Sequence, residues 1–174
     1  MRVYNLIKTF LFSTLLAACG SDHSGAHAPT PANDVEFIDG MVPHHQGALM
    51  MADMVLARGA KAELKTMAQQ MKDMQNQEIA AMKAARQQLT GSSETPPDTD
   101  PHMQADIEHM QHLAGAELDK MFLADMIPHH AGAIEMAHRA LPNLKRADLQ
   151  AMAMNIVSSQ AKEIGELQDM LSSY

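Results

Sequence analysis

The sequence predicts an all-α fold, a four-helix bundle made from two copies of one helical hairpin. Aromatic residues make up 3% of the chain and tryptophan is absent, whereas Ala, Leu, Gln, Glu, Lys and Met are frequent; this composition favours helix over sheet. The pattern Met-x-Pro-His-His occurs at residues 41–45 and again at residues 126–130, and an apolar helical segment follows each copy. Two hairpins that each carry one apolar face bury that face best against one another.

Residues 1–18 are predicted to be a lipoprotein signal peptide. Basic residues precede a short apolar run, and Leu16-Ala17-Ala18 leads into Cys19, the only cysteine of the chain. These four residues resemble the lipobox of bacterial lipoproteins, which implies that Cys19 becomes a lipidated N-terminus; an ordinary signal peptide with an incidental cysteine is the alternative. Because Gly20 rather than Asp follows Cys19, the resemblance implies a protein that faces the periplasm from the outer membrane rather than the inner one.

The exported chain is expected to be acidic and tethered. Removing Arg2 and Lys8 with residues 1–18 leaves 11 basic and 21 acidic residues, a net charge of −10 with histidine neutral. Nucleic-acid binding relies on Lys and Arg that neutralise phosphates, so this charge excludes nucleic acid as the expected partner. Residues 19–33 lack apolar periodicity and are expected to form a flexible tether, with the lipid anchor as the only contact with the membrane.

A first helix is expected from about Asp34 to Leu56, with Asn33 or Asp34 as its N-cap. Pro43 has no amide hydrogen and kinks a helix, so the helix either bends there or begins there. We prefer the bent helix, because apolar residues upstream of Pro43 continue the same face. At about 100° per residue, that face carries Phe37, Met41, His44, His45, Ala48, Met51, Ala52 and Val55.

A second helix is expected from about Lys61 to Leu89. Gln75 and Glu78 fall among its apolar positions, which are Leu64, Met67, Met71, Met74, Ile79 and Met82. Residues 91–101 are rich in Pro, Ser and Asp and are expected to form a linker. The first repeat therefore covers residues 34–90.

The second repeat is expected at residues 116–172, within a bundle domain of residues 34–174. Its helices run from about Ala116 to Leu141 and from about Leu144 to Leu171. A constant offset of 85 residues aligns Met67, Met71, Gln75, Glu78, Ile79 and Met82 with Met152, Ile156, Gln160, Glu163, Ile164 and Leu167.

An additional helical piece is expected at residues 102–121, bent at Gly115, before the third helix of the bundle. Its histidines His109 and His112 are three residues apart, so they could touch and form a secondary metal site. An exposed polar face explains these two histidines equally well.

The two copies of the repeated pattern are candidate metal sites. In each, a methionine and two histidines lie at positions i, i+3 and i+4, the spacing at which helical side chains converge. Thioether and imidazole together suit Cu(I), and by the same softness Ag(I), whereas Mg, Ca or Mn would want oxygen ligands. The candidate ligands are Met41, His44, His45, Met51, Met126, His129, His130 and Met136.

Core packing is the alternative explanation for these side chains, because a methionine stripe usually fills a core. That explanation must account for four histidines at equivalent positions of two repeats. It must also account for 17 methionines in 174 residues, where Leu would hold its shape better. Metal binding accounts for both observations, so we expect copper as the ligand, with Cu(I) preferred.

The partner helices carry polar pairs on their apolar faces: Gln75 with Glu78, and Gln160 with Glu163. Histidines that bind a metal usually donate their other ring N–H to a carboxylate or carbonyl. We therefore expect Glu78 and Glu163 to support the histidines. A solvated edge of the apolar face is the alternative explanation.

The duplicated Met-x-Pro-His-His, the Gly-Ala-x-x-Met-Ala that follows each copy and the Gln-x-x-Glu-Ile of each partner helix resemble the DUF305 family over residues 34–171. The resemblance implies a ferritin-like four-helix bundle. Since the family includes exported copper-binding proteins of the CopM type, it also implies binding of copper or silver in metal tolerance. One departure weakens the symmetry: Gly40 corresponds to Asp125 and Met50 to Glu135, so the two sites need not be equivalent.

Two other functions compete with copper buffering or transfer. A dimetal carboxylate oxidoreductase requires Glu-x-x-His on two helices, but Glu135 and His138 provide this motif once and residues 50–53 lack it. A structural or partner-binding lipoprotein would use its methionines as an adaptable surface and bind no metal. We expect no enzyme, and we expect a metal ion and a copper-handling protein as partners.

Overall fold

The computed structural model describes residues 30–174, and the predicted signal peptide, Cys19 and most of the tether lie outside the described residues. The all-α prediction is confirmed: the described chain is helical and contains no strand. Its five helices are α1 (Asp34–Arg58), α2 (Ala62–Thr90), α3 (Pro101–Gln111), α4 (Gly115–Ala140) and α5 (Ala147–Ser172).

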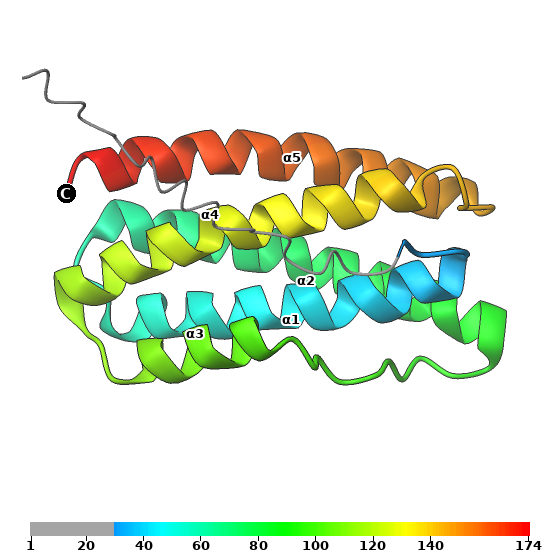
Figure 1. Cartoon of the computed structure of the whole chain (residues 1–174), viewed down its shortest axis with the longest axis horizontal. Helices are drawn as coiled ribbons and strands as arrows, with labels where there is room; N and C mark the ends of the chain where they lie inside the picture. The colour runs from blue at the N-terminus through cyan, green and yellow to red at the C-terminus, as the bar shows by residue number, and fades with distance from the viewer. Residues whose placement is uncertain (1–29) are drawn as a thin grey trace, which may run out of the picture.

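The bundle consists of two helical hairpins, α1–α2 and α4–α5, which pack together mainly through α1 and α4 (Figure 1). These two helices run in opposite directions, whereas α2 and α5 touch only sparsely. Helix α3 lies against α1 and α4, and the segment before it runs back along the bundle from the end of α2. Among residues 30–174, no helix has the length and apolarity needed to cross a membrane.

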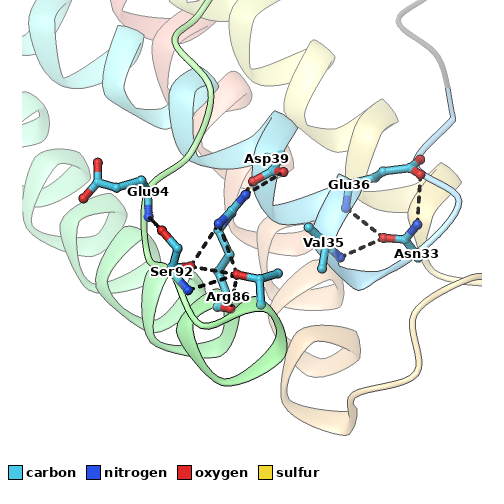
Figure 2. Close-up of polar contacts among 8 residues, drawn as sticks. Asn33, Val35, Glu36, Asp39, Arg86, Ser92 and Glu94 are labelled. Atoms are coloured by element: carbon cyan, nitrogen blue, oxygen red, sulfur yellow. Dashed lines mark hydrogen bonds and ion pairs between the residues drawn. The ribbon is translucent and has the colours of Figure 1, made fainter.

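Helix α1 runs through Pro43 without interruption, so the alternative that it begins at Pro43 is wrong. Its N-cap is Asn33, whose side-chain oxygen accepts hydrogen bonds from the backbone amides of Val35 and Glu36 at 3.0 Å each (Figure 2). Both amides lie in the first turn, where a helix has no internal acceptors for them. The apolar residues upstream of Pro43 therefore belong to the same helix as the histidines.

Arg86 fastens the far end of α2 to α1. Its guanidinium donates to the Asp39 carboxylate, with Nε–Oδ1 at 2.6 Å, and to the carbonyl of Ser92 at 2.9 Å (Figure 2). The same side chain thus holds the start of the segment between the repeats. This part of the chain has no regular secondary structure until Pro101, where α3 begins.

The extra helical segment predicted before the third bundle helix is confirmed as α3, but the prediction that it extends over residues 102–121 with a bend at Gly115 is wrong. Helix α3 ends at Gln111, and α4 begins at Gly115 after a short break. Gly115 has a φ of +62°, a left-handed conformation that glycine adopts without a clash from a Cβ atom. The glycine therefore separates two helices rather than bending one.

The hydrophobic core is divided into two clusters, which we call core A and core B. Core A includes Met51, Val55, Leu64, Met71, Phe122 and Met126. Core B includes Phe37, Met41, Ile79, Met82, Ala133 and Ile156. Phe122 and Met126 of core A are the repeat equivalents of Phe37 and Met41 of core B, so the pseudo-twofold relation between the hairpins exchanges the two cores.

Two carboxylates join the repeats at the ends of the bundle. Asp34 accepts a hydrogen bond from the backbone amide of Lys145 at 2.8 Å, and its repeat equivalent Asp119 accepts one from the amide of Lys61 at 2.8 Å. Lys61 and Arg146 are the N-caps of α2 and α5, and neither provides a side-chain cap of its own. Each hairpin therefore supplies the N-terminal cap of the other.

Candidate metal site

A polar layer crosses the middle of the bundle between core A and core B. On every long helix, its residues fall between the stretch that contributes to core A and the stretch that contributes to core B. The layer consists of His44, His45, Gln75, Glu78, His129, His130, Gln160 and Glu163. The fold thus brings the candidate histidines of both repeats to one place.

His44 and His129, which are repeat equivalents, meet where α1 crosses α4. Their ring centroids lie 3.8 Å apart and their planes are inclined by 35°. Gly132 on α4 permits this approach, because a Cβ atom at that position would lie 3.3 Å from Nε2 of His44. His45 and His130 flank the pair, with centroids 6.4 and 6.3 Å from their neighbours on the same helix.

His45 and His130 are each held by a glutamate of the partner helix. Nε2 of His45 lies 2.8 Å from Oε2 of Glu78, and Nε2 of His130 lies 2.7 Å from Oε2 of Glu163. The imidazoles are fully buried, whereas the carboxylate side chains are 14% and 15% exposed. These are the contacts expected from the sequence; the support of metal ligands by the two glutamates stays a prediction.

Unpaired polar atoms are concentrated in the layer. Among the described residues, nine buried side-chain nitrogen or oxygen atoms lack a hydrogen-bond partner, and eight of them belong to its histidines and glutamines. They include Nδ1 of all four histidines and Nε2 of His129. Gln75 contributes both atoms of its amide and Gln160 contributes Oε1. Because buried polar groups are normally paired, this concentration marks a candidate ligand site.

The histidines at the crossing are held neutral. Burial, followed by the neighbouring His45 and His130, lowers the pKa of His44 to about 3. Burial likewise lowers the pKa of His129 well below its ordinary value, with His44 as the next contributor. A neutral imidazole keeps a lone pair on one ring nitrogen, which is the form that binds a metal.

The candidate methionine ligands lie beside the layer. Met41, Met51 and Met126 are fully buried in core A or core B. Met136 packs on Gly40, where a Cβ atom would lie 3.1 Å from its sulfur. Within residues 30–174, no three His, Cys, Asp or Glu side chains are already grouped to hold a metal ion. A site here would therefore combine imidazoles with these thioethers.

The candidate secondary site is not assembled. His109 and His112 are both exposed, and His112 lies beyond the last residue of α3. Across the described chain, no ring contact joins these two histidines. His109 is close enough to Asp125 of α4 to counteract part of the rise in the pKa of that carboxyl.

The single Glu-x-x-His motif faces away from the polar layer. Glu135 and His138 are exposed, and Glu135 forms an ion pair with Arg139 at 3.0 Å. The layer contains Glu78 and Glu163 but lacks the Glu-x-x-His pairs that carboxylate dimetal sites use. This motif therefore lies outside the candidate site.

Asp125 is a partly buried carboxyl for which the sequence predicts no role. Its Oδ2 is buried without a partner, and burial, followed by repulsion from Asp106, raises its pKa to about 6. Gly40 occupies the equivalent position of the first repeat and leaves room there for the Met136 thioether. The alignment of the repeats shows that Asp125 replaces Gly40, but it does not show that the Asp125 carboxyl is partly buried.

A duplicated four-helix bundle with neutral imidazoles and thioethers at its centre defines a class of helical protein suited to soft metal ions. The chain belongs to the DUF305 family, a domain of unknown function whose family model matches residues 34–171.

Solved structures with the same fold include metal-bound proteins. CopM in its Cu(II)-, Cu(I)- and Ag-bound forms is 30–31% identical to this chain, with TM-scores of 0.69–0.73. These matches cover 81–82% of this chain and 96–97% of CopM. A DUF305 fragment from Deinococcus radiodurans is 25% identical, with a TM-score of 0.73, and the match covers 84% of this chain and all of the fragment. No curated protein matches the chain.

Proposed function

We propose that the protein binds Cu(I), and by the same chemistry Ag(I), in the polar layer at the centre of the bundle. The observation that carries the proposal is the convergence of four imidazoles from two repeats, all with a buried and unpaired Nδ1. His44 and His129 supply neutral donors from α1 and α4, and the buried thioethers of Met41 and Met126 are the nearest soft donors along the same helices.

The character of the donors favours a soft monovalent ion. Hard cations require several oxygen ligands, whereas the only carboxylates of the layer are engaged by His45 and His130. Thioether and neutral imidazole bind Cu(I) and Ag(I) without adding charge to a buried site. The Cu- and Ag-bound forms of CopM, about a third identical in sequence, support this choice of ion.

We further propose that the protein buffers or transfers copper rather than catalysing a reaction. The polar layer contains neither a nucleophile with a general base nor the carboxylate pairs of a dimetal oxidase. Export as a lipoprotein through Cys19 would place this activity at the envelope, where thioethers have the advantage that they cannot form disulfides. A copper-handling protein would then be the partner that delivers or receives the ion.

A Cu(I) competition titration with a chromogenic chelator tests the proposal. The delipidated wild-type domain should withdraw Cu(I) from the chelator through at least one tight site. Replacing His44, His45, His129 and His130 by Ala should abolish this withdrawal while the circular dichroism spectrum stays helical. The variant with His109→Ala and His112→Ala is the matched control and should bind as the wild type does.

Two results would contradict the proposal. Unchanged uptake by the variant without the four histidines would move the site out of the polar layer. Failure of the folded wild type to take up Cu(I), together with iron-dependent oxidase activity, would favour the enzyme alternative.

A further inference from the structure

His45 and His130 are fully buried and need a route from solvent, and the sparse contact between α2 and α5 provides a groove. This groove has a volume of about 650 Å³ and lies between the two helices. Its walls include Met74 and Glu78 from α2, and Asp148 and Met152 from α5. The groove thus brings two thioethers from different repeats beside Glu78, a carboxylate of the polar layer.

Glu78 connects this groove to the candidate metal site. Its carboxylate lines the groove and is partly exposed, and the same carboxylate lies 2.8 Å from Nε2 of the fully buried His45. The equivalent Glu163 makes the same kind of contact with His130 but does not line this groove. The pseudo-twofold relation is therefore broken, and the groove opens onto only one of the two histidine–glutamate pairs.

The chemistry of the groove suits a soft cation. Met74 and Met152 are partly buried, so their sulfur atoms are shielded from bulk water but are not enclosed in a core. No Lys or Arg lines the groove within the described chain, although Asp148 on its wall pairs with Arg146 at 2.7 Å. Thioethers bind Cu(I) and Ag(I) readily, and the Glu78 carboxylate attracts any cation.

A second groove, between α1 and α3, also has methionines on its walls. It has a volume of about 570 Å³ and is lined by Met50 and Met103. Pro43, which precedes His44 in the chain, lines it, but neither glutamate that hydrogen-bonds a histidine of the polar layer does, and Met103 packs tightly on Gly47. The α2–α5 groove is therefore the better route to the histidines.

We propose that the α2–α5 groove is a second soft-metal site, in which Met74 and Met152 take up Cu(I) or Ag(I) and pass the ion along Glu78 to the histidines. The transfer to the histidines depends on the proposed function of the polar layer, whereas capture by the two thioethers does not. The step involves no redox change: the ion exchanges thioether ligands for imidazole ligands and keeps its charge.

The test uses Ag(I), which is redox-stable, and the protein labelled with ¹³C at the methionine methyl groups. At low Ag(I), the methyl signals of Met74 and Met152 should shift first, followed by the ring signals of the polar-layer histidines. In stopped-flow uptake, the variant with Met74→Leu and Met152→Leu should load the histidines roughly tenfold more slowly, because a capture site raises the local ion concentration. The final occupancy of the histidines in this variant should equal that in the wild type.

The matched control is Met154→Leu, since Met154 is also on α5, is 55% exposed and lies outside the groove. This variant should load at the wild-type rate. A second comparison replaces Glu78 by Gln, which should slow uptake through the groove.

The outcomes separate the two proposals. Groove methyl shifts that persist in a folded variant with His44→Gln and His129→Gln would support the capture site independently of the histidines. Methyl shifts of Met74 and Met152 no larger than that of Met154, or wild-type loading by the double methionine variant, would overturn the groove proposal. In the wild type, methyl shifts of Met74 and Met152 without any change in the histidine ring signals would overturn both the transfer step and the proposed function. Only the proposal that the two thioethers capture the ion would then remain.

Discussion

At the scale of single residues, the imidazole rings of His44 and His129 lie with their centroids 3.8 Å apart. They cannot both take the positively charged form without a large electrostatic penalty. Burial alone already disfavours the charged form of each ring, and the next contribution comes from His45 for His44 and from His44 for His129. The crossing of α1 and α4 thus holds two neutral donors ready at neutral pH. The ion replaces no proton when it binds to them, which makes binding there independent of pH over the physiological range.

The first prediction concerns the titration of these rings in the metal-free protein. The pKa of His44 is about 3 in the folded state and 6.5 in the unfolded state, so only the unfolded state takes up a proton as the pH falls below 6.5. Stability is therefore complete above pH 6.5 and decreases as the pH falls toward 3, by about 1.4 kcal/mol per pH unit for each such histidine. Urea unfolding between pH 8 and pH 4 measures this slope.

The control for this titration is the variant with His44→Gln and His129→Gln, which should lose a large part of the acid slope. Ring carbon shifts in NMR spectra provide an independent readout. A midpoint for His44 near 6.5 in the folded protein would contradict the prediction.

The second prediction concerns Asp125. Its folded pKa of about 6 lies above the ordinary value of 3.8, so folding favours the protonated carboxyl. The stability contributed by this group is complete below pH 3.8 and is lost as the pH rises through 6. Asp125→Asn should therefore stabilise the protein by about 1 to 2 kcal/mol at pH 7.5, a value reduced for partial solvent exposure, and should have little effect at pH 3.5.

Urea unfolding at the two pH values measures the effect of Asp125→Asn. Asp106→Asn removes only the repulsion and should give a smaller gain of the same sign. Equal stabilisation by Asp125→Asn at both pH values would show that packing, rather than ionisation, is responsible.

At the scale of elements, the ends of the second helix of each hairpin depend on a carboxylate from the other hairpin. Lys61 and Arg146 have no side-chain oxygen to cap their helices. Asp119 and Asp34 instead accept their backbone amide hydrogens across the interface between repeats. Asp119 additionally accepts the hydroxyl hydrogen of Tyr174 at 2.6 Å, and burial together with this bond raises the pKa of the tyrosine.

The third prediction is that these caps contribute unequally to stability. Asp119→Ala leaves the amides of Ala60 and Lys61 and the Tyr174 hydroxyl without their acceptor and should cost about 3 to 4 kcal/mol. Asp34→Ala should cost about 2 kcal/mol, because it has one short amide contact and a weaker one. Urea unfolding at pH 7 gives both values.

The control is Glu166→Ala, which removes an exposed pair with Lys162 on α5 and should change stability little. A cost for Asp119→Ala no larger than that of this surface control would contradict the cross-repeat capping.

The sequence predicts the long helices well because each has a clear apolar period and a capping or breaking signal. Helix α1 begins at its predicted residue, and the Asn33 cap forms as expected. The sequence does not predict the cross-repeat contacts of Asp34 and Asp119, because these contacts join residues about 60 to 110 positions apart in the chain. The break between α3 and α4 escaped notice because it depends on the left-handed conformation of Gly115, which glycine permits in a helix or a turn alike.

The sequence predicts which residues make up the candidate site, but it does not predict how they are arranged in space. The repeat identifies the histidines, and the period of α2 and α5 places Glu78 and Glu163 on the faces that meet them. No local pattern states that His44 and His129 cross closely, since that depends on how α1 packs on α4. The groove beside Glu78 likewise results from the loose packing of α2 on α5. The apolar faces of the two helices are similar, so the sequence does not predict this loose packing.

At the scale of the whole molecule, the pseudo-twofold relation explains why the polar layer lies where it does. Core A and core B exchange under this relation, so a residue near the axis meets its own equivalent. Eight unpaired buried polar atoms in the middle of an apolar bundle oppose folding, because each such group carries a desolvation penalty. Local violations of this kind are expected at functional sites, where a ligand completes the pairing.

The last prediction is that neither hairpin folds as a monomer. Residues 30–98 alone would expose the face of α1 that packs on α4. They would also lack the Asp119 cap of α2 and the His129 ring that lies against His44. A second copy of the same hairpin offers Asp34 in place of Asp119 and His44 in place of His129, so self-association can replace each lost contact. The helical signal of this fragment should therefore rise with protein concentration.

Sedimentation and circular dichroism over a wide concentration range measure this coupling, and mixing with residues 99–174 should restore a one-to-one complex. The complex should bind Cu(I) as the intact domain does, because its imidazoles again come from both repeats. A helical, monomeric fragment at low concentration would show that each hairpin is stable by itself. The polar layer would then be an interface between two independent units, and the cross-repeat caps would contribute little to its formation.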